Sequence, residues 1–76
     1  MKPAQVRMAR AALNWSLQQL ADASGVHRNT ISNYELGKYA GEPATLIAIR
    51  RALERAGVEF TTGDEPGVKL RNARKR

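Results

Sequence analysis

The segment from residue 16 to residue 38, SLQQLADASGVHRNTISNYELGK, constrains the fold more than any other part of the chain. Ser16 is suited to cap the start of a helix, and Gln19, three residues later, completes the pattern of a capping box. Gly25 stands where this short helix would end in a left-handed residue, a conformation that glycine adopts without steric cost. A second helical pattern begins at Arg28. The segment therefore predicts two short helices joined by a tight turn.

The second of these helices carries a polar arc opposite an apolar side. At about 100° per residue, Ile31 and Tyr34 fall on one side and four polar residues on the other. Arginine is suited to hydrogen-bond guanine in the major groove, and asparagine is suited to adenine. The same residue types also form ordinary solvated helix faces, and composition alone does not separate the two interpretations. The four arc residues are Arg28, Asn29, Ser32 and Asn33.

The order of residues in this segment resembles the helix-turn-helix of the phage Cro and repressor family of DNA-binding domains. The resemblance extends from about residue 5 to residue 57. Two positions depart from the common pattern, because Leu17 stands where glutamine is frequent and His27 stands where the family usually has Ser or Thr. The residues that carry the resemblance are Leu20, Ala21, Gly25, Val26, Ile31 and Tyr34, together with the E-x-G-K ending formed by Glu35, Gly37 and Lys38.

The resemblance implies a mainly α, four-helix, repressor-like helix-turn-helix fold. It also implies a sequence-specific regulator of transcription, a repressor that acts as a dimer on a near-palindromic operator. It implies that the arc residues face base edges and that Arg10 pairs with Glu35. It also places the loop after Gly37 against the DNA backbone. We expect the backbone contacts to come from Gln18, His27, Lys38 and Tyr39. For His27 the alternatives are a phosphate, a base edge or a place in the turn; for Tyr39 the alternative is a ring that covers the core.

Helical patterns flank this segment on both sides. Pro3 suits the first turn of a helix whose apolar stripe contains Val6, Ala9 and Leu13. Pro43 opens a fourth helix, which extends to Ala56. Its predicted core residues are Leu46, Ile49 and Leu53, with Ile47 widening the stripe.

The chain changes character after residue 57. The runs VEF and VKL alternate apolar and polar residues around a segment rich in turn formers, which predicts a hairpin or strand with Phe60 opposite Val68. An isolated hairpin is marginal, so it must pack on the helices or on another subunit. We thus divide the chain into a DNA-binding domain (1–57), a hairpin that can serve dimerisation (58–70) and a basic disordered tail (71–76).

Composition restricts the classes of function. The 76 residues contain 13 Lys and Arg against 7 Asp and Glu, a net charge of +6 that favours a polyanionic partner. Cysteine is absent, and a single histidine does not make a metal site. No nucleophile–base pair, carboxylate dyad or phosphate-binding loop is recognisable, so we expect no enzyme, no catalytic residue, no cofactor and no metal.

The expected partners follow from these restrictions. They are double-stranded DNA and a second copy of the chain, with a small protein or RNA polymerase as further partners. No apolar run approaches the roughly 20 residues of a membrane span, so we expect no membrane contact and a cytoplasmic location in a phage or bacterial system. The alternative function is an antitoxin-like protein-interaction module that also binds DNA.

Overall fold

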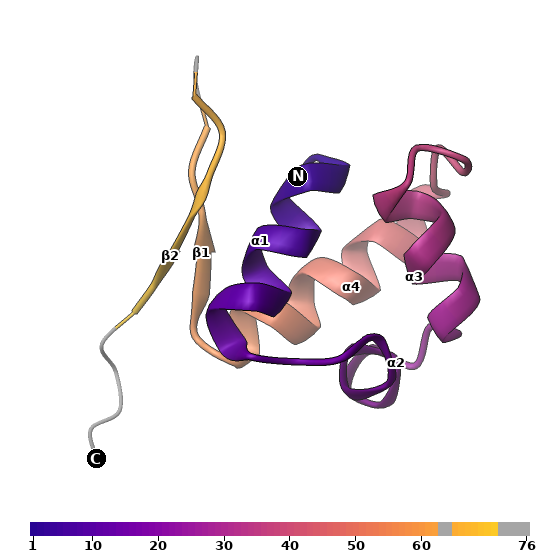
Figure 1. The fold of residues 1–76 in the computed structure, drawn as a ribbon, viewed down its shortest axis with the longest axis horizontal. Coiled ribbons are helices and arrows are strands. Elements are labelled where there is room, and N and C mark those ends of the chain that lie inside the picture. Colours follow the sequence, from indigo (N-terminus) through magenta and orange to yellow (C-terminus); the bar gives the residue numbers. More distant parts are fainter. Residues whose placement is uncertain (63–64, 72–76) are drawn as a thin grey trace.

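Four helices and a two-stranded hairpin make up the computed structural model, which describes residues 1–62 and 65–71 (Figure 1). Residues 63 and 64 of the predicted turn, and residues 72–76 of the predicted tail, lie outside the described residues. The mainly helical fold class is confirmed. The elements are α1 (Pro3–Leu13), α2 (Leu17–Ser24), α3 (Arg28–Glu35), α4 (Pro43–Arg55), β1 (Val58–Phe60) and β2 (Val68–Leu70).

The turn between α2 and α3 follows the local signals of the sequence. The Ser16 hydroxyl oxygen accepts a hydrogen bond from the Gln19 backbone N–H (3.1 Å), and the Gln19 side-chain oxygen accepts one from the Ser16 N–H (2.7 Å). Gly25 ends α2 with a φ of 76°. No atom lies within 4 Å of a Cβ added at Gly25, so the backbone conformation rather than space calls for glycine at this position. The chain thereby turns directly into α3.

The core is formed by residues from all four helices and β1. Its largest fully buried side chains are Val6, Leu20, Ile31, Ile49, Leu53 and Val58. Burial of an aliphatic side chain of this size stabilises a fold by about 1.5–3 kcal/mol. Trp15 is half-buried and packs against this cluster. The predicted stripes of α1 and α4 thus meet in one core.

The prediction that Ile47 belongs to the core is wrong. Its side chain is 48% exposed, whereas Ile49 is fully buried. Two residues along an α-helix correspond to a rotation of about 200°, so Ile47 points to the outer face of α4 when Ile49 points inward. Arg50 and Arg51 lie on that same outer face.

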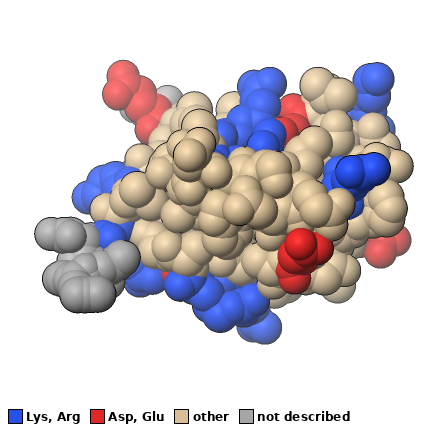
Figure 2. All heavy atoms as spheres, turned by 60° about the horizontal axis from the view of Figure 1, so that its bottom comes forward, with Lys and Arg blue, Asp and Glu red and all other residues tan. Residues whose placement is uncertain are grey.

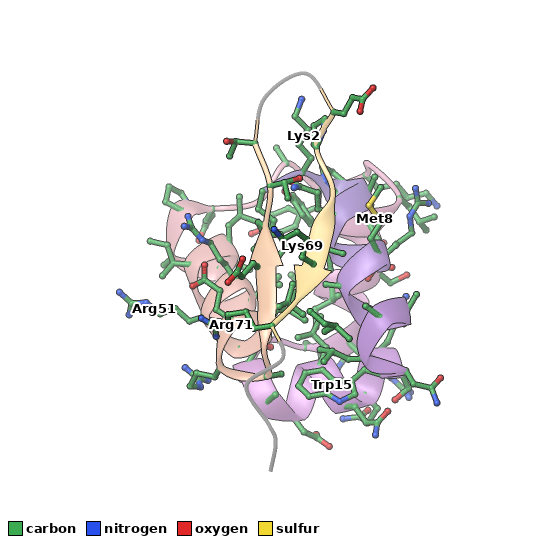
Figure 3. The ribbon with its side chains drawn as sticks, turned by 90° about the vertical axis from the view of Figure 1, so that its left-hand side faces the viewer. Lys2, Met8, Trp15, Arg51, Lys69 and Arg71 are labelled. Atoms are coloured by element: carbon green, nitrogen blue, oxygen red, sulfur yellow. The ribbon has the colours of Figure 1, made fainter. Side chains whose placement is uncertain are left out.

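The hairpin packs on α1 and α4 of its own chain (Figures 1 and 3). The strands are antiparallel with Phe60 opposite Val68, the predicted register, and Val58 opposite Leu70. Val58 is buried, and Phe60 and Val68 pack against the core. Among the described helices, none has the length and the apolar character that crossing a membrane requires.

A buried glutamine in α1 attaches the hairpin to the helices. Gln5 Nε2 donates to the backbone oxygens of Thr61 and Gly67, both at 2.9 Å, and thus bridges the two sides of the hairpin. Gln5 Oε1 accepts a hydrogen bond from the Lys2 backbone N–H at 2.7 Å. The amide group of Gln5 is therefore occupied at both ends, which is the condition for burying a polar group at low cost.

Candidate nucleic-acid interface

The outward side of α3 is the polar arc that the sequence predicts. Arg28, Asn29 and Asn33 are exposed and Ser32 is half-buried. Ile31 and Tyr34, on the other side of the helix, are buried in the core. Figure 1 shows α3 at the side of the molecule farthest from the hairpin. The helix therefore presents its amides and guanidinium to solvent, and its buried apolar side fixes its orientation.

An ion pair braces α3 against α1. Arg10 Nε donates to Glu35 Oε2 at 2.7 Å and Arg10 Nη2 donates to Glu35 Oε1 at 2.9 Å, a bidentate geometry. Arg10 Nη1 also donates to the Trp15 backbone oxygen at 3.1 Å. The hydrogen bond to Glu35 raises the pKa of Arg10 above its ordinary value, against the opposing effect of burial. Both partners of this pair are among the residues singled out from the sequence.

A second contact is made by the neighbouring residue at the same end of α3. The Tyr34 hydroxyl donates to the Met1 backbone oxygen at 3.2 Å. Burial raises the pKa of Tyr34, because removal from water disfavours the charged phenolate. The neutral hydroxyl thus remains the donor, and α3 is tied to both the start and the end of α1.

His27 caps the start of α3. Its Nδ1 accepts a hydrogen bond from the Asn29 backbone N–H at 3.0 Å. Because Nδ1 is the acceptor, the neutral ring carries its proton on Nε2, where it is a donor. The imidazole therefore takes the capping role that Ser or Thr more often fills, and it has one N–H group left to donate.

Gln18, His27 and Arg28 border one hollow of about 330 Å³ between α2 and α3. Asp22 lines the same hollow and accepts a hydrogen bond from Gln18 Nε2 at 2.8 Å. The four-residue spacing of Gln18 and Asp22 on one helix is the signal that could have indicated this contact. The hollow thus combines predicted DNA-contacting groups with an acid that the sequence interpretation did not assign to the site.

Lys38 and Tyr39 lie in the loop between α3 and α4. Lys38 is exposed, and its backbone N–H donates to the Asn33 oxygen at 2.8 Å. Tyr39 is half-buried against the core, and its hydroxyl oxygen accepts a hydrogen bond from the Glu42 backbone N–H at 3.0 Å. The tyrosine ring therefore covers the core, and the hydroxyl proton is left to donate.

Positive charge is dispersed over the molecule. Figure 2 turns the bottom of Figure 1, where α2 lies, toward the viewer and shows Lys and Arg in separate groups around a broad uncharged surface. Within residues 1–62 and 65–71, no group of three or more acidic or histidine side chains is arranged to hold a metal ion. The arc of α3 is polar, with one arginine among two asparagines and a serine, and it is not a dense basic patch.

Comparison with known protein families gives a match over most of the chain. A family model described as Helix-turn-helix matches residues 6–60, from within α1 to the end of β1. No match was found among curated proteins. The match covers more than half of the chain and includes α2, the turn and α3 in full.

Proposed function

The chain belongs to the Cro/repressor-type helix-turn-helix family of DNA-binding transcription regulators, and on this premise we propose that it is a repressor that binds a near-palindromic operator as a dimer. The proposal rests on the polar arc of α3, which faces outward opposite the buried side chains of Ile31 and Tyr34. Repression would follow from occupancy, because a dimer seated on its operator obstructs polymerase.

In this proposal α3 enters the major groove. Arg28 and Asn33 hydrogen-bond base edges, and Asn29 and Ser32 assist them. Phosphate contacts fix the position of the helix without reading sequence. They come from the backbone amides at the start of α2 and from the side chains of Gln18, His27, Lys38 and Tyr39.

The dimer contact is assigned to the strand edges of the hairpin and to Leu70. Leu70 lies opposite Val58, on the face that packs on α1 and α4, yet it is 50% exposed. Pairing of strand edges across a two-fold axis would satisfy backbone groups that otherwise face water. Because Val58 is fully buried, removal of the whole hairpin would also damage the core, and Leu70→Asp is the cleaner test.

Two measurements test the proposal. Selection from random duplexes should recover a near-palindrome with half-sites roughly 10–10.5 base pairs apart. Sedimentation should show a dimer for the native chain and a monomer for Leu70→Asp, with Glu65→Ala as an exposed control on the same hairpin. If the selection recovers no common sequence, the chain does not bind a specific operator. If Leu70→Asp remains a dimer, the hairpin does not form the dimer contact.

A further inference from the structure

The outer face of α4 carries an exposed apolar side chain among arginines. Ile47 and Arg50 border a hollow of about 250 Å³ together with Arg51 and Glu54. A second hollow of about 110 Å³ is lined by Ile47, Arg50, Leu46 and Met1. Arg50 also borders a third hollow, of about 180 Å³, that reaches the hairpin. We call the first two hollows together the α4 groove; its residues are Met1, Leu46, Ile47, Arg50, Arg51 and Glu54.

The floor of the α4 groove is apolar and anchored. Leu46 and Met1 are half-buried and pack against the core, and Ile47 lies beside them at the surface. Met1 is held in place by the hydrogen bond from the Tyr34 hydroxyl to its backbone oxygen. The floor is therefore a preformed surface, which lowers the entropy cost of binding.

The rim of the α4 groove is basic. Arg50 Nε pairs with Glu54 Oε2 at 3.0 Å, and both side chains are well exposed. Exposed pairs of this kind contribute only about 0–1 kcal/mol, so Arg50 can exchange Glu54 for another carboxylate at little cost. Among the described residues no carboxylate forms an ion pair with Arg51, whose side chain projects outward from the molecule (Figure 3).

We propose that the α4 groove binds an acidic amphipathic helix of a partner protein. An apolar centre flanked by arginines is the composition found at the energetic centres of protein interfaces. A helix that places apolar side chains over Ile47 and carboxylates toward Arg50 and Arg51 complements the groove in both shape and charge. None of the groove residues belongs to α2 or α3, so this surface is separate from the proposed DNA interface.

Charge disfavours the two other occupants. A second copy of the chain, docked groove to groove, would place four arginines against two Glu54 carboxylates, and this excess of like charge opposes association. A DNA backbone would match the arginines but would provide no apolar surface to cover Ile47. An acidic helix satisfies both the arginines and the isoleucine.

The test uses the full chain and a synthetic peptide of about 15 residues, which as a helix is long enough to span the 13 residues of α4. The peptide has leucines on one helical face and glutamates beside them, and its partner control replaces every glutamate with lysine. Fluorescence anisotropy should detect binding of the acidic peptide and none of the basic one. Ile47→Glu and Arg51→Glu should each weaken binding by about tenfold or more, as expected for residues at the centre of an interface.

Met8→Glu provides the matched control, because Met8 is a similarly exposed apolar residue (42%) on α1, outside the groove. It should leave peptide affinity unchanged. Circular dichroism checks that each variant is folded, and Ile47→Ala and Arg51→Ala replace any variant that is not. Equal affinity of the Ile47 variant and the native chain would overturn the proposal.

Two further results would assign the groove to another occupant and also overturn the proposal. One is loss of the dimer in Ile47→Glu, measured by sedimentation. The other is a loss of affinity for random duplex in Arg51→Glu as large as the loss of affinity for the peptide. Neither result bears on base reading by α3, so failure here is distinguishable from failure of the proposed function.

Discussion

α1 holds two regions of the molecule by different chemistry. It holds α3 through the bidentate ion pair of Arg10 with Glu35, and it holds the hairpin through the neutral amide of Gln5, which donates to the oxygens of Thr61 and Gly67. A buried charge left without its partner is far more costly than a neutral group that loses a hydrogen bond. The comparison indicates that the position of α3 is enforced more strictly than that of the hairpin, as the proposed reading of bases by α3 would require.

The largest effect should come from breaking the α3 attachment. Glu35→Ala leaves Arg10 partly buried without its carboxylate, and loss of one partner of a buried pair typically costs about 3–5 kcal/mol. Because the Arg10 side chain retains some exposure to water, we expect the lower part of that range. Thermal or urea unfolding measures the change.

Glu54→Ala is the matched control for this attachment. Glu54 also pairs with an arginine, but on the exposed face of α4, and its loss should change the free energy of unfolding by about 0–1 kcal/mol. Equal destabilisation by the two substitutions would remove the distinction between a structural and a solvated ion pair in this chain.

Breaking the hairpin attachment should cost less. Gln5→Ala removes the side-chain donor to the Thr61 and Gly67 backbone oxygens. The Gly67 oxygen still accepts from the Thr61 N–H, so the Thr61 oxygen is the group that loses its donor, and an unsatisfied buried polar group costs about 1–3 kcal/mol. Hydrogen exchange should accelerate at the Thr61 amide, which bonds across the hairpin to Gly67, and remain slow in the core of α3. Gln18→Ala, at an exposed glutamine, should leave both the free energy of unfolding and the exchange at the Thr61 amide unchanged. If Gln5→Ala accelerated exchange more in α3 than in the hairpin, Gln5 would stabilise the whole fold and not the hairpin alone.

The smallest of the three effects concerns the cap of α3. His27→Ala removes the acceptor for the Asn29 N–H, and loss of an N-cap costs about 0.5–2 kcal/mol. His27→Asn should restore most of the stability, since asparagine is a favoured cap. If the alanine and asparagine variants unfold at the same temperature, the imidazole contributes nothing as a cap, and α3 depends on α1 alone.

Features that depend on local chemistry were predictable from the sequence. The Ser16 cap, the left-handed Gly25 and the pairing of Phe60 with Val68 each follow from residues close in sequence or from strict alternation. The attachment by Gln5 was not predictable, because its partners are backbone oxygens 56 and 62 residues away, and every residue has such an oxygen. The ion pair of Arg10 with Glu35 was predictable only from the family resemblance, because the two residues are 25 positions apart in the sequence.

The functional residues divide in the same way. The polar arc of α3 follows from helical periodicity, whereas the cap formed by His27 required the ring orientation. Ile47 was misassigned because apolar character was given more weight than its angle relative to Ile49. The exposed Ile47 lines both hollows of the α4 groove.

We propose that α3, held in place by α1, reads bases. Losing a bidentate base contact costs about 1–3 kcal/mol on the correct sequence and little on random DNA. Losing a phosphate contact weakens both and lowers the salt slope by about one unit. Arg28 and Asn33 are assigned to bases and Lys38 to phosphate.

The most direct test is the ratio of operator affinity to random-duplex affinity, measured across a salt series for Arg28→Ala, Asn33→Ala and Lys38→Ala. We expect each of the first two variants to lower the ratio by a factor that corresponds to about 1–3 kcal/mol, and we expect Lys38→Ala to leave the ratio nearly unchanged. If all three variants weaken binding to operator and to random duplex equally, α3 does not read sequence.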